Sequence, residues 1–118
     1  MAVAKLQSIV LETNDVRALA HFYRELTGMT ASYEDDEWIT LEAPGISDLC
    51  FQRAPGHKPP AWPDEASSMQ YHFDFVVEDL DAAEAEALRL GATKFAHQPG
   101  ENFRVFADPS GHVFCLCQ

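Results

Sequence analysis

The sequence predicts an α+β fold made of two similar modules, each with the order strand, helix and three further strands. The first observation is an internal repeat, because a shift of about half the chain places Ser8 on His72 and Gly28 on Gly91. The second is that apolar and polar residues alternate in each expected strand. The third is that each opening strand runs into an apolar stripe of helical spacing that ends at a glycine.

The first module is expected at about residues 5–53. Its opening strand, residues 6–13, alternates in polarity, and Asn14 or Asp15 can cap the following helix by accepting hydrogen bonds from free first-turn amides. The helical stripe begins at Val16 and ends at Gly28. Three more strands follow, with an acidic turn between the first two: residues 30–33, 38–43 and 49–53.

A proline-rich segment, residues 54–68, is predicted to link the modules, because proline neither continues a helix nor completes a strand ladder. Trp62 is its one bulky aromatic residue. Two interpretations of Trp62 stay open: it packs over the domain edge, or it covers a ligand site carried by the scaffold.

The second module is expected at about residues 69–118. Its opening strand, residues 69–77, places His72, Asp74 and Val76 on one face. The spacing of Asp81 and Glu84 resembles a capping box for the next helix. The remaining strands are expected at residues 93–97, 102–107 and 113–117, with a turn at residues 108–111.

Composition narrows the class of protein. The chain has 118 residues, 47% of them hydrophobic, which suits one domain whose two halves share a core. The formal charge of −11 repels nucleic acid and anionic membrane surfaces. No apolar run is long enough to span a bilayer, so a cytoplasmic protein is expected.

The three cysteines are predicted to be buried and reduced. Cys50, Cys115 and Cys117 all lie in apolar, strand-like runs. An odd number of cysteines does not form a closed disulfide framework, and reduced cysteine packs as a small hydrophobic residue.

Three segments resemble the vicinal oxygen chelate superfamily, which includes glyoxalase I, bleomycin-resistance proteins, fosfomycin-resistance enzymes and extradiol dioxygenases. These segments are Asn-Asp-Val-Arg-Ala-Leu-Ala-His-Phe-Tyr-Arg-Glu-Leu-Thr-Gly, Tyr-His-Phe-Asp-Phe with Glu-Asp-Leu-Asp-Ala-Ala behind it, and Phe-Ala-Asp-Pro-Ser-Gly-His. The likeness covers essentially the whole chain and is closest to the small glyoxalase-like branch. It implies paired βαβββ modules whose mixed sheets curl around a cleft, with the helices outside, and a homodimer.

Metal-using members of the superfamily place His or Gln and then Glu on the first and last strands of each module. In this chain those places fall on Ser8, on Cys50 or Gln52, on His72 and on Cys115. Only His72 matches, and no carboxylate remains for a hard divalent ion. We therefore expect no metal and no cofactor. Two thiolates and one imidazole leave Zn²⁺ or Cu(I) open as an alternative.

His72 and Asp74 have two interpretations. A carboxylate beside an imidazole raises the imidazole pKa, so the pair could serve as a general acid or base. Alternatively, the two side chains line the cleft and hold ligand or water by hydrogen bonds. A nucleophilic arrangement of Cys115 with these residues is weakened because no helix N-terminus is expected near the thiol to depress its pKa.

Arg104 is predicted to face the cleft. If residues 108–111 form a four-residue hairpin loop, Arg104 lies opposite Cys115 and shares its face. Its guanidinium could then bind a carboxylate or phenolate ligand, or it could form an ion pair with Asp74 or Glu12.

Two functions of different class follow. The first is metal-free binding of a small aromatic or amphipathic molecule, with no nucleic-acid or membrane partner. The second is an enzyme, either a metal-dependent lyase, isomerase or dioxygenase or an acid–base catalyst that uses His72 and Asp74. Fold resemblance does not decide between them, because one scaffold hosts many reactions. The predicted ligand-binding residues are Ser8, Cys50, Gln52, Trp62, His72, Asp74, Arg104 and Cys115.

Overall fold

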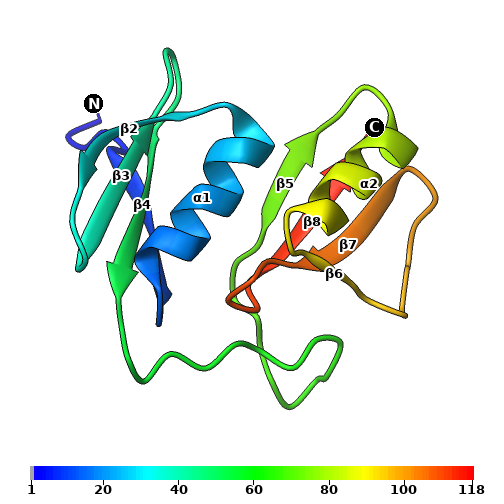
Figure 1. Cartoon of the computed structure of the whole chain (residues 1–118). Helices are drawn as coiled ribbons and strands as arrows, with labels where there is room; N and C mark the ends of the chain where they lie inside the picture. The colour runs from blue at the N-terminus through cyan, green and yellow to red at the C-terminus, as the bar shows by residue number, and fades with distance from the viewer. Residues whose placement is uncertain (1) are drawn as a thin grey trace. The chain divides into compact units, whose positions relative to one another are not determined.

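The structure is a computed structural model that describes residues 2–118, and its contacts divide the chain into two compact units (Figure 1). Unit one extends to His57 and unit two runs from Lys58 to Gln118. In unit one the elements are β1 (Ser8–Thr13), α1 (Val16–Thr27), β2 (Thr30–Glu34), β3 (Trp38–Glu42) and β4 (Asp48–Arg53). In unit two they are β5 (Phe73–Val76), α2 (Leu80–Arg89), β6 (Thr93–Lys94), β7 (Phe103–Ala107) and β8 (Val113–Cys117). The repeated βαβββ order confirms the predicted fold class.

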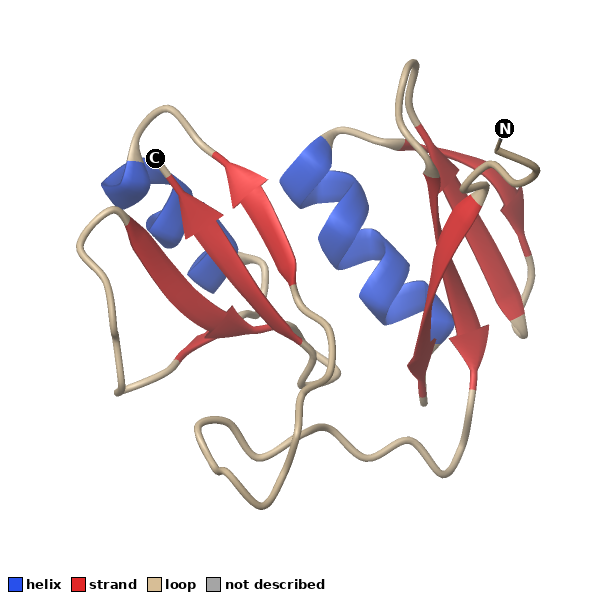
Figure 2. Cartoon of the chain, turned by 180° about the vertical axis from the view of Figure 1, so that it is seen from behind, coloured by secondary structure: helices blue, strands red, loops and turns tan. Residues whose placement is uncertain are grey.

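Each unit contains a four-stranded mixed sheet with the same connectivity. The strand order is β1-β4-β3-β2 in unit one and β5-β8-β7-β6 in unit two. The outer pairs β1–β4 and β5–β8 are parallel, and the other neighbours are antiparallel. Figure 2 shows each helix along one face of its own sheet. Within the described residues, the opposite face of each sheet is not covered by a helix of the same unit.

Helix α1 forms where its sequence supplies both caps and an apolar stripe. The Asp15 carboxylate accepts a hydrogen bond from the Ala18 amide at 3.1 Å. Gly28 ends the helix with φ of 74°, a left-handed conformation that glycine adopts without a Cβ penalty. The buried ring of Tyr23 stacks on that of Phe51, with the ring centres 5.8 Å apart. The core of unit one therefore lies between α1 and its sheet, as the helical stripe predicts.

Helix α2 is capped by a different residue from the one that the sequence pattern indicates. The side chain of Asp79 accepts a hydrogen bond from the Ala82 amide at 3.1 Å and is the N-cap. The predicted capping box of Asp81 and Glu84 is wrong, because both carboxylates bind the Arg104 guanidinium instead, at 2.8 and 3.2 Å. The acidic first turn of α2 thus ties the helix to β7.

The two sheets repeat in register as well as in topology. Cys50 of β4 pairs with Val10 of β1, and Cys115 of β8 pairs with Asp74 of β5. The two cysteines consequently occupy matching places in the two units, as the internal repeat predicts.

The loop between β7 and β8 contains five residues, not four. Ala107 pairs with Val113, and the Asp108 carboxylate accepts hydrogen bonds from the amides of Ser110 and His112 at 2.9 and 3.0 Å. The predicted turn with Asp108 bonding to the backbone ahead is confirmed, but His112 belongs to the loop.

This loop length moves Arg104 to the other face of the sheet. Arg104 pairs with Leu116, whereas Val105 pairs with Cys115. A shift of one residue in strand register transfers every side chain to the opposite face. The prediction that Arg104 faces the same side as Cys115 is therefore wrong. Its ion-pair partners within unit two are Asp81 and Glu84 on α2 and not Asp74, which one of the two interpretations had suggested.

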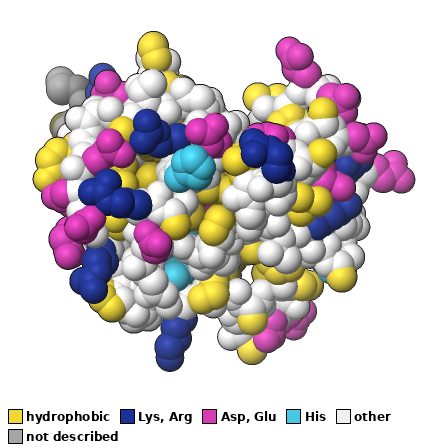
Figure 3. Space-filling model, in the orientation of Figure 1, with side chains coloured by type: hydrophobic (Ala, Val, Ile, Leu, Met, Phe, Trp, Pro, Cys, Tyr) yellow, Lys and Arg dark blue, Asp and Glu magenta, His cyan; other side chains and the backbone are white. Residues whose placement is uncertain are grey.

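Charged side chains of both signs lie interspersed on the molecular face drawn in Figure 3. All three cysteines are free, and Cys50 and Cys115 are buried as predicted. Cys117 is only half-buried, so the prediction of burial is wrong for this residue. Within residues 2–118, neither helix is both long and apolar enough to cross a membrane.

Candidate ligand-binding site

A pocket of about 320 Å³ lies on the face of the unit-two sheet that points away from α2. This volume is within the range of small-molecule sites in proteins. Every lining residue belongs to unit two: Trp62, Met69, His72, Asp74, Pro99, Phe103, Val105, Val113, Cys115 and Cys117.

The pocket has mostly apolar walls. Val105, Val113 and Cys115 form a buried cluster on β7 and β8, against which Trp62 and Phe103 pack. Trp62 also contacts aromatic neighbours: its ring centre lies 4.9 Å from that of Phe95 and 5.6 Å from that of His97. Trp62 thus packs against other residues of unit two and borders the pocket. That it covers a bound ligand stays a prediction.

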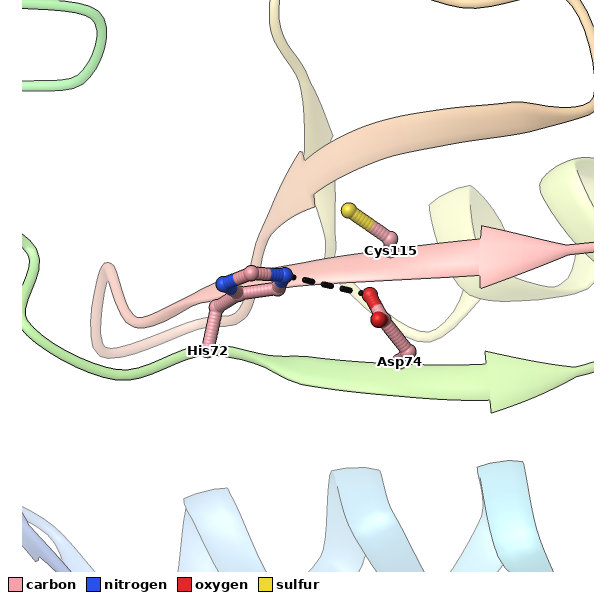
Figure 4. A group of neighbouring side chains, drawn as sticks. All are labelled: His72, Asp74 and Cys115. Carbon is pink, nitrogen blue, oxygen red and sulfur yellow. Dashed lines mark ion pairs between the residues drawn. The ribbon is translucent and has the colours of Figure 1, made fainter.

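One corner of the pocket is polar. In Figure 4, His72 from the segment before β5, Asp74 from β5 and Cys115 from β8 lie together. The His72 Nε2 atom lies 3.1 Å from Asp74 Oδ1. The side chains of His72 and Asp74 are 38% and 63% exposed, whereas Cys115 is 6% exposed. The imidazole and carboxylate are therefore within reach of a ligand, and the thiol lies beneath them.

The thiol of Cys115 is unsuited to nucleophilic catalysis. Burial raises its pKa to about 12, and the charge of the Asp74 carboxylate and a hydrogen bond to it act in the same direction. The same causes, burial first, raise the pKa of Cys117. Since a thiolate is the reactive species, these raised pKa values argue against the nucleophilic arrangement of Cys115 with His72 and Asp74.

We expect the raised pKa of Cys115 to make stability depend on pH above 9. The folded-state pKa, about 12, exceeds the ordinary value of 9.0, so the unfolded chain loses this proton first as pH rises. The thiol's contribution to stability is complete below pH 9 and is lost progressively between pH 9 and 12. Urea denaturation at several pH values between 9 and 12 measures the free energy of unfolding. This free energy should fall less steeply with pH for Cys115→Ala than for the wild type. Equal slopes for the two proteins would contradict the prediction.

The metal that the superfamily resemblance implies can be tested against the donor atoms present. His72, Asp74 and Cys115 each offer one donor atom, and these atoms all lie within 4.8 Å of one another. An imidazole, a carboxylate and a thiol are an unsuitable set for a hard ion such as Mg²⁺, which prefers oxygen ligands. The residues therefore do not fit the hard divalent metals, although a soft thiol beside an imidazole is compatible with Zn²⁺.

Three predicted ligand-binding residues lie in unit one. Ser8 begins β1 and is half-buried, and Gln52 on β4 is exposed. Cys50 is buried, with its Sγ atom 3.6 Å from Thr40 Oγ1. That these residues share a cleft with His72 and Cys115 stays a prediction. Arg104 does not line the unit-two pocket, since it faces α2.

The sequence interpretation missed several pocket residues. Cys117 could have been found from its spacing of two from Cys115, which places both thiols on one strand face. Phe103 and Val105 share the corresponding face of β7, but the wrong loop length assigned that face to Arg104. Met69 and Pro99 come from segments without regular structure and carry no periodic signal.

The duplicated βαβββ order agrees with the vicinal oxygen chelate superfamily that the sequence resembles. The match is specific at the family level: residues 8–117 fit the model of the glyoxalase-like domain, so the chain belongs to that family. A comparison with curated protein sequences finds no match to this chain.

Solved structures support the fold. A glyoxalase/bleomycin resistance protein/dioxygenase family enzyme from Burkholderia phytofirmans is 20% identical, with a TM-score of 0.75 over 96% of this chain and 97% of that one. A genomically encoded fosfomycin resistance protein from Listeria monocytogenes is 16% identical, with a TM-score of 0.74 over 98% and 91%. A glyoxalase-related enzyme from Fulvimarina pelagi is 19% identical, with a TM-score of 0.70 over 98% and 88%. At these identities the likeness concerns the fold alone.

Proposed function

We propose that this protein binds a small aromatic or amphipathic molecule in the unit-two pocket, without a metal ion. The observation that carries the proposal is the combination of apolar walls with one polar corner, formed by His72, Asp74 and Cys115. Such pockets bind ligands through apolar contact and orient them with a few polar groups.

The names of structural neighbours agree with this proposal in general terms. They include a glyoxalase/bleomycin resistance protein/dioxygenase family enzyme and a fosfomycin resistance protein. Whether this chain shares such a role depends on its own pocket, because similar folds carry different activities.

Calorimetric titration with a panel of indoles and other aromatic molecules tests the proposal. We expect saturable binding by protein purified without added metal, unchanged after treatment with a chelator. Failure of the whole panel to bind would contradict the proposed function. Binding that disappears with the chelator and returns with one divalent metal would contradict its metal-free part.

A second candidate is an enzyme centred on the polar corner. The observation that favours it is the 3.1 Å separation of His72 Nε2 from Asp74 Oδ1, a distance that suits an oriented acid–base pair. The neighbouring Cys115 thiol extends the candidate to Zn²⁺ chemistry. If His72→Ala abolishes turnover but leaves ligand binding intact, the enzyme is favoured over binding alone.

We also propose a cytoplasmic homodimer, on the strength of the superfamily resemblance. Sedimentation at micromolar concentration tests the assembly directly. A monomer under those conditions would exclude the proposed dimer without affecting the pocket.

A further inference from the structure

We infer that the unit-two pocket selects aromatic molecules that carry a positive charge over neutral and anionic molecules of the same shape. The inference rests on the proposed ligand-binding function and names the charge class of its ligand. It is opposite to one of the two interpretations of Arg104 that the sequence left open, in which the guanidinium would attract a carboxylate or phenolate.

The first argument is the charge of the lining. The ten residues around the pocket include the Asp74 carboxylate, and Lys and Arg are absent from them. With histidine counted as neutral, the lining carries one negative charge. The Asp74 side chain is 63% exposed, so an ammonium group can approach it while remaining partly hydrated. Within unit two, the neighbours of this carboxylate are His72 and the two thiols, and the pocket lining adds no Lys or Arg to them.

The second argument is the placement of Arg104 and Lys94, two of the four basic side chains of unit two. Arg104 lies on the α2 face and is held by Asp81 and Glu84. Lys94 pairs with Glu84 at 2.8 Å, on the same side of the sheet as Arg104. These two cations are therefore engaged away from the pocket and do not offset the charge of Asp74.

The third argument concerns the wider charge and the aromatic walls. Unit two has ten Asp and Glu residues against four Lys and Arg residues, a formal charge of −6, which attracts cations and repels anions. Trp62 and Phe103 border the same pocket as Asp74. The negative faces of aromatic rings attract ammonium groups, most strongly in the case of Trp. Carboxylate and rings thus favour the same ligand charge.

The test compares three indoles that differ mainly in charge: tryptamine, tryptophol and indole-3-acetate. Each is titrated by calorimetry into the wild type, Asp74→Asn and Glu78→Gln. Glu78 is exposed, lies outside the pocket and serves as the matched control for loss of one negative charge. Thermal unfolding of each variant verifies that it is folded.

We expect tryptamine to bind the wild type about fivefold more tightly than tryptophol, with indole-3-acetate weakest, as suits a partly exposed ion pair. Asp74→Asn should remove the preference for tryptamine, and Glu78→Gln should retain it. Equal or tighter binding of tryptophol or indole-3-acetate would overturn the inference and leave the proposed function standing. A preference that survives in Asp74→Asn would also overturn it. If tryptamine does not bind, the inference fails, and titration with the full aromatic panel then decides whether the proposed function fails with it.

Discussion

Replacing Trp62 with Ala is expected to weaken tryptamine binding by about thirtyfold, which corresponds to about 2 kcal/mol. Trp62 borders the pocket and packs on Phe95, with the ring centres 4.9 Å apart. A bulky aromatic side chain held in place in this way supplies a large contact area at low entropic cost. Its removal should open the apolar wall to water. Calorimetric titration of the variant measures the change.

Two further variants make the Trp62 result specific. Trp62→Phe keeps an aromatic ring and should lose about threefold at most, which corresponds to less than about 1 kcal/mol. Tyr71→Ala removes a ring that is exposed and does not line the pocket, so binding should stay as in the wild type. Unchanged affinity in a folded Trp62→Ala protein would exclude Trp62 from the ligand site.

Replacing Phe114 with Ala is expected to lower the free energy of unfolding by about 3–5 kcal/mol. The Phe114 side chain is fully buried on β8 and stacks on Phe106, with the ring centres 5.4 Å apart. Phe75 contacts it edge-on from β5, at 6.0 Å. Truncation removes buried apolar surface and leaves a cavity that the stiff sheet cannot fill. Urea denaturation followed by circular dichroism gives the difference.

Val76→Ala is the matched control for Phe114→Ala. Val76 lies on the neighbouring strand β5 but is 88% exposed, so its loss should change stability by less than about 0.5 kcal/mol. A loss of less than about 1 kcal/mol for Phe114→Ala would indicate that the core of unit two is not organised around this ring.

Local sequence patterns predicted the helices and strands well, because the residues that start, stop and bury each element lie within or next to that element. Helix α1 follows from a stripe of helical spacing, a cap at Asp15 and a glycine at position 28 that adopts positive φ. The buried strand β4 follows from an apolar run near Cys50. The start of β5 was predicted less well. The strand was expected from residue 69 but begins at Phe73, which leaves His72 in the preceding segment.

The face on which a side chain lies was harder to predict than the element that contains it. Asp81 and Glu84 have the spacing of a capping box, yet the local pattern does not reveal that a guanidinium from β7 lies beside them. The position of Arg104 in turn depends on whether the Asp108 loop holds four residues or five. The Asp108 carboxylate decides this by accepting hydrogen bonds from amides as far along as His112.

The sequence by itself determined the repeated βαβββ order, the matching places of Cys50 and Cys115, and the closeness of His72 to Asp74 at the start of β5, because these depend on periodicity and internal repetition. Only the tertiary structure decided which apolar residues surround His72 and Asp74 and which cation is absent from the pocket. The physical reason is that one extra residue in a hairpin loop transfers a whole strand face, and with it Arg104, to the other side of the sheet. That single shift in register removes from the pocket the cation that one interpretation of the sequence had offered to a carboxylate or phenolate ligand.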